Sequence, residues 1–295
     1  MLLSISFDPD HGPSGDAGFG EYQERIAALS DAAPDFVVLG RETPEGAIAP
    51  GRLEAVVALP WVATQLPNSA VIATIPALHS VPFHISRALS AADFVSAGRT
   101  GWLPSTARHE LFDHAYGKGY AVDAGQVVPK YEDFIRATQA LWDSWDDDAL
   151  ILDKASGRYL DSDKVRRVDY RGVFFSTMGP LNAARPPQGH PLLMRDLADV
   201  PASTVAADVT VSTGARTADA APIHLIKTDA ASVEQAARTV REGGADGLHL
   251  IGRDALAALP ALRASYPQAE GKGTTARARL GLPVPVNPFA GREAA

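Results

Sequence analysis

Cysteine is absent from the sequence. Its absence excludes disulfides, thiolate zinc sites and cysteine nucleophiles, so that a metal site would need histidine and carboxylate ligands alone. The eight histidines include no pair at the helical spacing of metalloproteases. Ser14 also lacks the strand, turn and helix that flank a hydrolase nucleophile. We therefore expect no metal and no hydrolase chemistry.

Long apolar runs and an excess of basic residues are missing as well. No run approaches the roughly 20 apolar residues that span a bilayer, and the segment Met1 to Asp8 lacks the basic region of a secretory signal. Lysine and arginine number 27 against 35 acidic residues, which gives a net charge of −8. That sign does not suit a surface that neutralises phosphate backbones. We expect no membrane and no nucleic acid as partners, and the cytoplasm as the compartment.

The composition is that of a globular protein. Hydrophobic residues make up 46% and charged residues 21% of the 295 positions, and the 25 glycines and 22 prolines are scattered. Disorder, collagen and coiled coil are excluded by these values. The length suits either one large α/β domain or two of medium size.

Apolar runs alternate with helical patterns from the start of the chain, which predicts a parallel sheet. Eight runs are strand candidates: Leu2 to Phe7, Asp35 to Gly40, Ala70 to Ile75, Thr100 to Leu103, Pro191 to Met194, Asp208 to Ser212, Ile223 to Lys227 and Gly247 to Ile251. Helices are predicted at Phe19 to Ala32, Leu53 to Gln65, Pro82 to Ala97, Pro129 to Trp145, Ser232 to Arg241 and Ala255 to Arg263. Eight strands predict a single (β/α)₈ barrel domain over residues 1–295. Its second half is trimmed, because the connections after the fifth and sixth strands are too short for full helices.

Two segments are predicted to lie outside the barrel wall. Residues 146–171 are polar and lack sustained periodicity, and we expect this excursion to cover the barrel mouth. A short strand is expected at Val173 to Ser176, and residues 266–295 are predicted to form an extended tail along the outside.

Two residues stand where barrel enzymes build their sites, at the carboxyl ends of strands. His79 follows the third strand and Trp102 ends the fourth. A histidine at this place also suits the capping of backbone groups, and a tryptophan also suits core packing. Gly15 to Gly20 has the wrong spacing for a dinucleotide-binding loop.

Three stretches together resemble the bacterial-luciferase-like flavin monooxygenases, in the branch that contains nitrilotriacetate and dibenzothiophene-sulfone monooxygenases. They are Pro82-Phe83-His84-Ile85-Ser86-Arg87 with Asp93 to Trp102; Tyr131 to Phe134, Leu141 to Ala149, Asp163-Lys164-Val165, Gly179-Pro180-Leu181-Asn182 and Pro187-Gln188-Gly189; and Gly273 to Arg277 with Leu280 to Pro283. The resemblance implies a (β/α)₈ barrel, reduced FMN delivered by a separate flavin reductase, molecular oxygen and a small organic substrate. The cofactor would carry the difficult chemistry.

The resemblance also implies the residues of the flavin cleft. Trp102, Thr106 and Tyr131 match the family pattern. Thr74 joins them by its place on the third strand, and His79 stands where the family has a tyrosine. His79 and the more distant His109 are the catalytic candidates.

Departures from the family pattern concern the phosphate of the flavin. The family's fifth strand leads into Gln-Ala-Gly-Ser-Ser-x-x-Gly, whose hydroxyls and helix N-terminus bind the phosphate. Here the chain reads Met194 to Asp199 without glycine or hydroxyl, which leaves Arg195 as the charged partner of a phosphate.

These departures keep two functions open, an FMN-dependent monooxygenase and a non-catalytic paralogue that binds a flavin or other ligand or serves as a partner subunit. We also expect a homo-oligomer, because a barrel without covering helices exposes apolar surface.

Overall fold

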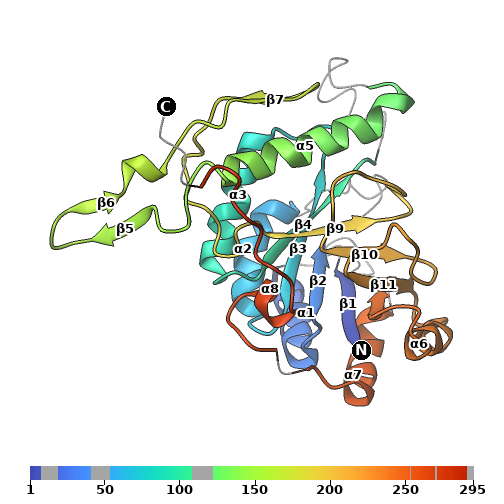
Figure 1. Cartoon of the computed structure of the whole chain (residues 1–295). Coiled ribbons are helices and arrows are strands. Elements are labelled where there is room, and N and C mark those ends of the chain that lie inside the picture. Colours follow the sequence, from blue (N-terminus) through green and yellow to red (C-terminus); the bar gives the residue numbers. More distant parts are fainter. Residues whose placement is uncertain (8–18, 41–53, 108–121, 253, 270, 291–295) are drawn as a thin grey trace.

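Eight parallel strands close into a barrel in the computed structural model, which describes residues 1–7, 19–40, 54–107, 122–252, 254–269 and 271–290 (Figure 1). Their order around the barrel is β1-β12-β11-β10-β9-β4-β3-β2. The strands are β1 (Leu2–Phe7), β2 (Phe36–Leu39), β3 (Ala70–Pro76), β4 (Thr100–Ser105), β9 (Leu192–Asp196), β10 (Val209–Ser212), β11 (Ile223–Thr228) and β12 (Gly247–Leu250). The predicted α/β fold, a (β/α)₈ barrel, is confirmed, and each strand coincides with one of the eight apolar runs.

The helices lie on the outside of the barrel. They are α1 (Phe19–Ala32), α2 (Ala55–Gln65), α3 (Pro82–Val95), α5 (Val127–Trp142), α6 (Val233–Arg241), α7 (Ala255–Ser265) and α8 (Ala276–Arg279), with short 3₁₀ turns at Ala124–Gln126 and Ser162–Lys164. Figure 1 shows α5 running across the outside of the strands beside α3. Every helix in the described ranges is too short or too polar to cross a bilayer.

Side chains of the strands divide into two apolar layers, since successive residues of a strand point to opposite faces. The inner layer fills the barrel and includes Phe36, Val38, Ile72, Leu103, Leu192, Met194, Val209, Val211 and Leu225. The outer layer packs against the helices and includes Leu3, Ile5, Val37, Leu39, Val71, Ala73, Trp102, Leu248 and Leu250. Both faces of the sheet are therefore buried, as is general for parallel sheets.

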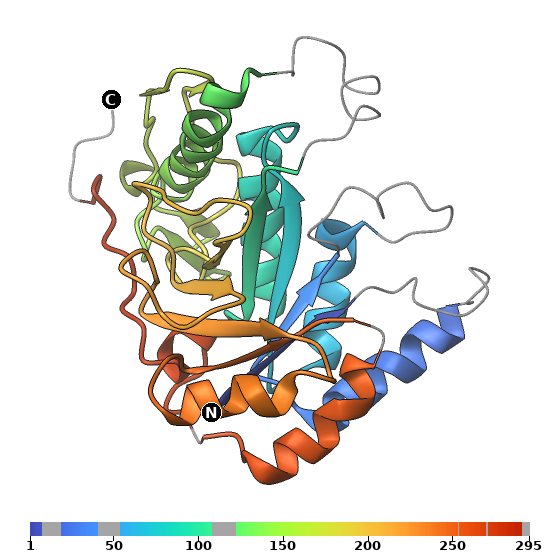
Figure 2. The same ribbon diagram turned by 90° about the vertical axis from the view of Figure 1, so that its right-hand side faces the viewer.

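Loops take the place of helices after β9 and β10, within residues 197–208 and 213–222 (Figure 2). The trimmed second half is thus confirmed. Val200, Val205 and Ala221 from these loops are buried in the outer layer. The apolar surface that we expected to be exposed here is therefore covered by the chain itself, which removes the stated reason for self-association.

The excursion at residues 146–171 does not cover the barrel mouth, which corrects that prediction. It contains the hairpin β5 (Leu150–Asp153) and β6 (Arg158–Leu160), which projects to the left in Figure 1 while the arrowheads of β9 and β10 point to the right. Arg166, near the end of this segment, binds Asp146 at its start, with nitrogen–oxygen distances of 2.6 and 2.7 Å, and donates to the carbonyl of Phe289 in the tail. These contacts close the excursion beside the end of α5 and join it to the tail.

A second small hairpin, β7 (Tyr170–Arg171) with β8 (Ser176–Thr177), also lies outside the barrel. It overlaps the strand expected at Val173 to Ser176 at a single residue. Asp133 of α5 anchors its turn, because its carboxylate accepts the backbone N–H groups of Phe174 and Phe175.

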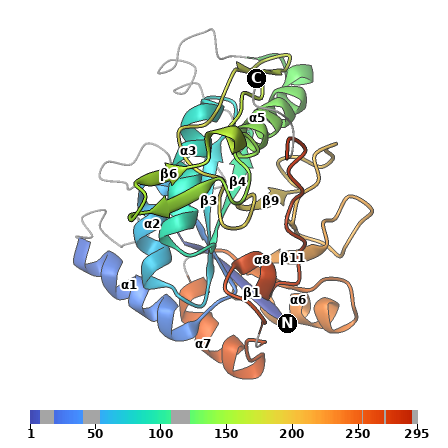
Figure 3. The ribbon, with the colours of Figure 1, turned by 60° about the vertical axis from the view of Figure 1, so that its left-hand side comes forward.

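The C-terminal segment runs along the outside from α8 to the end of α5 (Figure 3). Asn287 donates to the carbonyl of Trp145 at 2.9 Å, and Arg185 donates to the carbonyl of Pro285 at 2.7 Å. As far as residue 290, these contacts hold the segment against the outside of the barrel.

Candidate functional site

At the carboxyl ends of the barrel strands, the side chains that point into the barrel are polar. Deeper in the barrel, the side chains of the inner layer are apolar. Six residues share the inward register at the strand ends: Ser6, Thr74, Ser105, Asp196, Lys227 and His249. Their partners across the sheet include Val38, Leu103 and Val211, which belong to the inner layer. Because barrel enzymes build their sites at this end of the strands, this polar layer is the candidate site.

Asp196 and Lys227 form an ion pair inside the barrel. The Lys227 ammonium lies 2.5 Å from Oδ2 of Asp196, and the two side chains are 11% and 7% exposed. Asp196 also accepts the backbone N–H of Ala198 at 2.9 Å. Charges this far from water are tolerated where they are paired and hydrogen-bonded. The pair sets a fixed dipole across the ends of β9 and β11.

His249 is fully buried and bridges two hydroxyls of the neighbouring strand β1. Its Nδ1 lies 2.8 Å from Oγ of Ser4, and its Nε2 lies 2.9 Å from Oγ of Ser6. A hydroxyl both donates and accepts, so either neutral tautomer satisfies both contacts. The imidazole is thereby fixed in orientation beside Lys227, its partner in the sheet register.

Thr74 brings a buried hydroxyl without a hydrogen-bond partner among the described residues. Gly40, with φ +88°, lies next to it, and a Cβ at that position would be 3.4 Å from Cβ of Thr74 and 3.3 Å from Cβ of Ala55. A buried polar group without a partner costs free energy. The hydroxyl of Thr74 is therefore available to form a hydrogen bond with a ligand.

Trp102 lies on the other face of the sheet. It is fully buried, and its ring centroid is 5.9 Å from that of Phe134 and 5.6 Å from that of Trp142. The neighbouring Gly101 and Leu103 take the inward register. The structure thus places Trp102 in the core between β4 and α5, apart from the polar layer.

Tyr131 and Arg195 are neighbours on that same outer side. Tyr131 is buried, and burial raises the pKa of its hydroxyl, with the charge of Arg195 opposing and those of Asp199 and Glu132 adding to the rise. The Arg195 guanidinium donates to the carbonyls of Asp219 at 2.5 Å and Ser203 at 3.5 Å. It is 5% exposed, so it holds the two loops after β9 and β10 together and is not directed into the barrel.

Thr106 follows β4 and binds the chain that follows β9. Its backbone N–H donates to Oδ2 of Asp199 at 2.7 Å, and its hydroxyl donates to Oδ1 of the same carboxylate. Both hydrogen-bond donors of Thr106 are therefore engaged by one side chain.

The two catalytic candidates differ in what the structure says of them. His79 lies just beyond β3 and is 6% exposed, in a turn that is tied to β4 by a 2.9 Å bond from the N–H of Ala77 to the carbonyl of Ser105. His109 lies outside the described residues. The strand ends thus bring His79, Thr74 and Thr106 to one edge of the barrel. The flavin role of every predicted site residue stays a prediction.

Sequence reasoning missed Ser6, Ser105, Asp196, Lys227 and His249. A signal for them exists, since each is a polar residue in the inward register of an otherwise apolar strand. It could be read only once the register of each strand was known.

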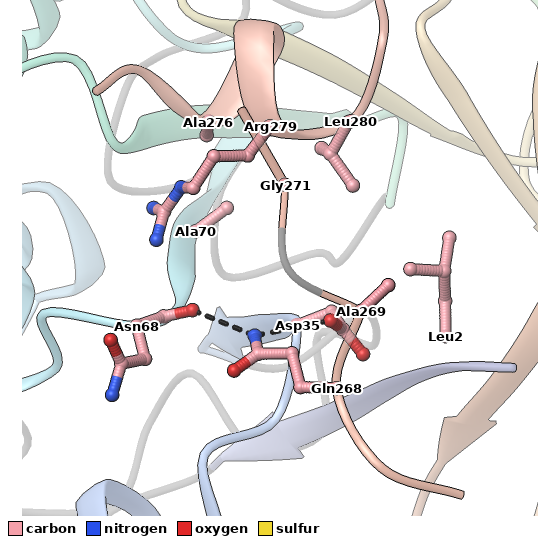
Figure 4. Close-up of a pocket in the computed structure, with 10 residues that line it drawn as sticks. All are labelled: Leu2, Asp35, Asn68, Ala70, Gln268, Ala269, Gly271, Ala276, Arg279 and Leu280. Carbon is pink, nitrogen blue, oxygen red and sulfur yellow. Dashed lines mark hydrogen bonds between the residues drawn. The ribbon is translucent and has the colours of Figure 1, made fainter. Parts of the chain in front are cut away.

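A pocket of about 460 Å³ opens at the opposite, N-terminal face of the barrel (Figure 4). Its polar groups bind one another: Nε2 of Gln268 donates to the carbonyl of Asn68 at 3.0 Å and to Asp35 at 3.2 Å. Asp35 also accepts from Arg263 at 2.8 Å. Residues at this end of a barrel serve stability. Across the described ranges, no three histidine or acidic side chains gather in the manner of a metal site.

Comparisons with known proteins agree on a family. No protein-family model matches the chain. A subunit of pristinamycin IIA synthase from Streptomyces pristinaespiralis is 33% identical over 288 residues, which cover 91% of this chain and 91% of that protein. Dibenzothiophene-sulfone monooxygenase from Rhodococcus erythropolis is 35% identical over 123 residues, or 42% of this chain, and the match spans only 27% of that longer protein.

The crystal structure of DmoA from Hyphomicrobium sulfonivorans has the same fold. Its TM-score is 0.76 at 14% identity, and the superposition covers 100% of this chain and 97% of the other. The similarity to the pristinamycin synthase protein extends over almost the whole of both chains. The chain therefore belongs to the luciferase-like flavin monooxygenase family.

Proposed function

We propose that the chain functions as a reduced-FMN-dependent monooxygenase that acts on a small organic substrate, with a separate flavin reductase supplying the reduced flavin. The observation that carries this proposal is the polar layer at the carboxyl ends of a closed parallel barrel. The Rhodococcus relative is named as a monooxygenase, which supports the same chemistry for this chain. Reduced flavin, when bound, supplies the electrons that activate molecular oxygen.

The polar layer suits the recognition of a ring with hydrogen-bonding edges. Thr74 contributes the unused hydroxyl, and the Asp196–Lys227 pair contributes fixed charges of both signs. Because these groups are held by strands of one closed barrel, they need little reorganisation when a ligand binds. The inner apolar layer beneath them excludes water from the floor of the site.

The phosphate of FMN does not fit Arg195, the residue predicted to hold it, or Thr106 nearby. Arg195 is buried and donates to two backbone carbonyls, and both donors of Thr106 bind the Asp199 carboxylate. The short turn after β9 also provides no helix N-terminus within residues 197–208.

Anaerobic titration with photoreduced FMN, followed by admission of oxygen, tests the proposed function. We expect saturable binding, and an absorbance transient of an oxygenated flavin after oxygen is admitted. Thr74→Val should weaken the binding of reduced FMN, whereas the exposed Asp31→Asn on α1 serves as a control that should not change it. Absence of saturable FMN binding, oxidised or reduced, at millimolar concentration would contradict the proposal.

A second candidate is a partner subunit without catalysis of its own. The observation that favours it is the engagement of Arg195 and Thr106 by the chain itself. The Streptomyces relative is named as one subunit of a synthase, which supports it too. Self-association is part of the proposal for either candidate, and sedimentation at about 10⁻⁶ M tests it against the affinity of ordinary dimers. A chain that binds no flavin would favour the partner subunit.

A further inference from the structure

Thr106 and Asp199 form a complete anion-binding contact within the chain. One N–H and one hydroxyl of Thr106 converge on the two oxygens of a single carboxylate. Thr106 and Asp199 are each held by the end of a barrel strand, β4 and β9, although they are 93 residues apart in sequence. Charge-assisted hydrogen bonds of this kind are the contacts by which proteins hold phosphate oxygens.

The turn after β9 positions the Asp199 carboxylate at Thr106. The N–H of Val200 donates to the carbonyl of Asp196 at 2.9 Å, and the N–H of Ala198 donates to the Asp196 side chain. Thr106 is 6% exposed, so its two donors have little access to solvent. A phosphate oxygen could reach them only by displacing Asp199.

The surrounding charges do not favour a second anion at this place. Asp196 and Glu132 bring two further carboxylates to the same part of the structure, and these engage the cations Lys227 and Arg136. Arg195, the nearby cation, is directed to the carbonyls of Ser203 and Asp219. A phosphate group carries up to two negative charges at neutral pH, and like charges at short range repel each other.

We propose that the Asp199 carboxylate occupies the position of a ligand phosphate at Thr106, so that the chain does not bind the phosphate of a flavin there. Where the chain binds flavin, which rests on the proposed function, FMN and riboflavin bind equally well. Recognition then depends on the ring and the ribityl chain.

Fluorescence titration with riboflavin and FMN, at an ionic strength of about 0.15 M, measures the preference directly. For the unmodified chain we expect the two dissociation constants to agree within about threefold, which is small on the free-energy scale of binding. Asp199→Ser should tighten FMN binding by about tenfold to hundredfold, the range of one or two charge-assisted hydrogen bonds, and leave riboflavin unchanged.

Matched variants separate the contact from the general effect of charge. Asp219→Ser removes the same charge from an exposed position whose carbonyl, and not its side chain, contacts Arg195, and it should leave both affinities unchanged. Thr106→Val added to Asp199→Ser should abolish the gain, because it removes the hydroxyl donor. Asp199→Asn keeps the shape of the side chain and replaces Asp199→Ser if the latter does not fold, as judged by thermal unfolding.

Each outcome decides between the two proposals. FMN binding that is more than about tenfold tighter than riboflavin binding in the unmodified chain would overturn the role of Asp199 while leaving the proposed function intact. A folded Asp199 variant without any gain for FMN would overturn it as well. If the unmodified chain binds neither flavin, the proposed function fails, and calorimetric titration of inorganic phosphate into Asp199→Ser decides the inference: saturable binding supports it and no binding overturns it.

Discussion

The guanidinium of Arg277 binds both carboxylate oxygens of Asp208, with nitrogen–oxygen distances of 2.7 and 2.8 Å. The same side chain donates to the carbonyls of His190 and Pro283, both at 3.1 Å. Asp208 in turn accepts the N–H of Leu193. This contact fixes the C-terminal segment to the starts of β9 and β10, at the end of the barrel opposite to the candidate site.

Other parts of the sequence that resemble the family meet at the same end. Asp93 accepts from Thr100 and Gln188, and the side-chain oxygen of Gln188 accepts the N–H of Arg277. The N–H of Ala276 donates to the carbonyl of Gly98 at 2.7 Å. Much of the resemblance is thus carried by contacts that hold the scaffold, and its strength says little about the chemistry at the mouth.

Arg277→Lys should destabilise the fold strongly. A lysine ammonium keeps the charge but does not reproduce the planar, bidentate contact with Asp208, and each charge-assisted hydrogen bond that is lost costs about 1.5–3 kcal/mol. Urea unfolding monitored by tryptophan fluorescence measures the loss. Arg279→Lys is the control, because the Arg279 guanidinium makes a long, exposed hydrogen bond of 3.4 Å to the carbonyl of Pro67. Equal midpoints for the two variants would contradict the structural role of the Arg277–Asp208 pair.

Substitutions of Trp102 and Thr74 should separate stability from ligand binding. Trp102→Ala removes a fully buried ring from the β4–α5 core and should cost about 3–5 kcal/mol of unfolding free energy. Thr74→Val removes a hydroxyl that has no partner among the described residues, so stability should change by less than about 1 kcal/mol. The flavin affinity of the folded protein should fall for Thr74→Val alone. If the conservative variant Trp102→Phe kept its stability but bound flavin more weakly, Trp102 would instead belong to the flavin site.

The sequence predicts the scaffold well because strand and helix periods are local. The helix Phe19–Ala32 has the predicted bounds, and each barrel strand is a short apolar run. The inward and outward sides of those strands could not be assigned in the same way, because both faces are buried and the runs are almost continuously apolar. Trp102 and Leu103 are adjacent, equally apolar and on opposite faces.

The directions of several side chains depend on contacts between distant residues. Arg195 is a plausible phosphate partner from its place at the end of a strand. Its direction, however, is set by Ser203 and Asp219, which belong to two different loops. The hydrogen bond from Arg166 to the carbonyl of Phe289, which joins residues 146–171 to the tail, likewise has no local signal. Such contacts are set by the tertiary fold.

Glu132→Gln should loosen the loop after β9. The Glu132 carboxylate accepts the Ser203 hydroxyl at 2.9 Å and the N–H and hydroxyl of Thr204, both at 2.6 Å. Burial raises the pKa of Glu132, but these hydrogen bonds and Arg136 outweigh that effect, so the pKa is lowered. Hydrogen exchange should show faster exchange at the Thr204 amide in the variant, with the amides of β12 as an internal control. An unchanged exchange rate at Thr204 would show that Glu132 does not anchor the loop.

The pH dependence of that anchor follows from the sign of the shift. A carboxylate whose pKa is lower in the folded state contributes stability that is present above its unfolded pKa, about 4.3, and lost as the pH falls through the folded value. The difference in unfolding free energy between the unmodified chain and Glu132→Gln should therefore shrink below about pH 4. A difference that is independent of pH would mean that the charge of Glu132 contributes nothing.

His190 should make the fold sensitive to mild acid. Burial, with the nearby charges of Arg185 and Arg277, lowers the pKa of His190 to about 3, although Asp208 and Asp147 oppose the shift. Its Nε2 lies 2.8 Å from Oδ1 of Asp143, but Arg185 binds that same oxygen, so the imidazole stays neutral. In the unfolded chain a histidine takes up a proton near pH 6.5. Stability is thus complete above pH 6.5 and falls as the pH decreases toward 3.

Unfolding in urea at pH 7.5 and at pH 5 checks this prediction. His190→Asn keeps a side-chain amide near Asp143 but cannot titrate, so it loses the contribution of this residue to the pH dependence. The unmodified chain should lose about 2 kcal/mol more than His190→Asn between the two pH values, from the difference between an unfolded pKa near 6.5 and a folded pKa near 3. Parallel losses in the two proteins would mean that His190 is protonated in the folded state and forms a charged pair with Asp143.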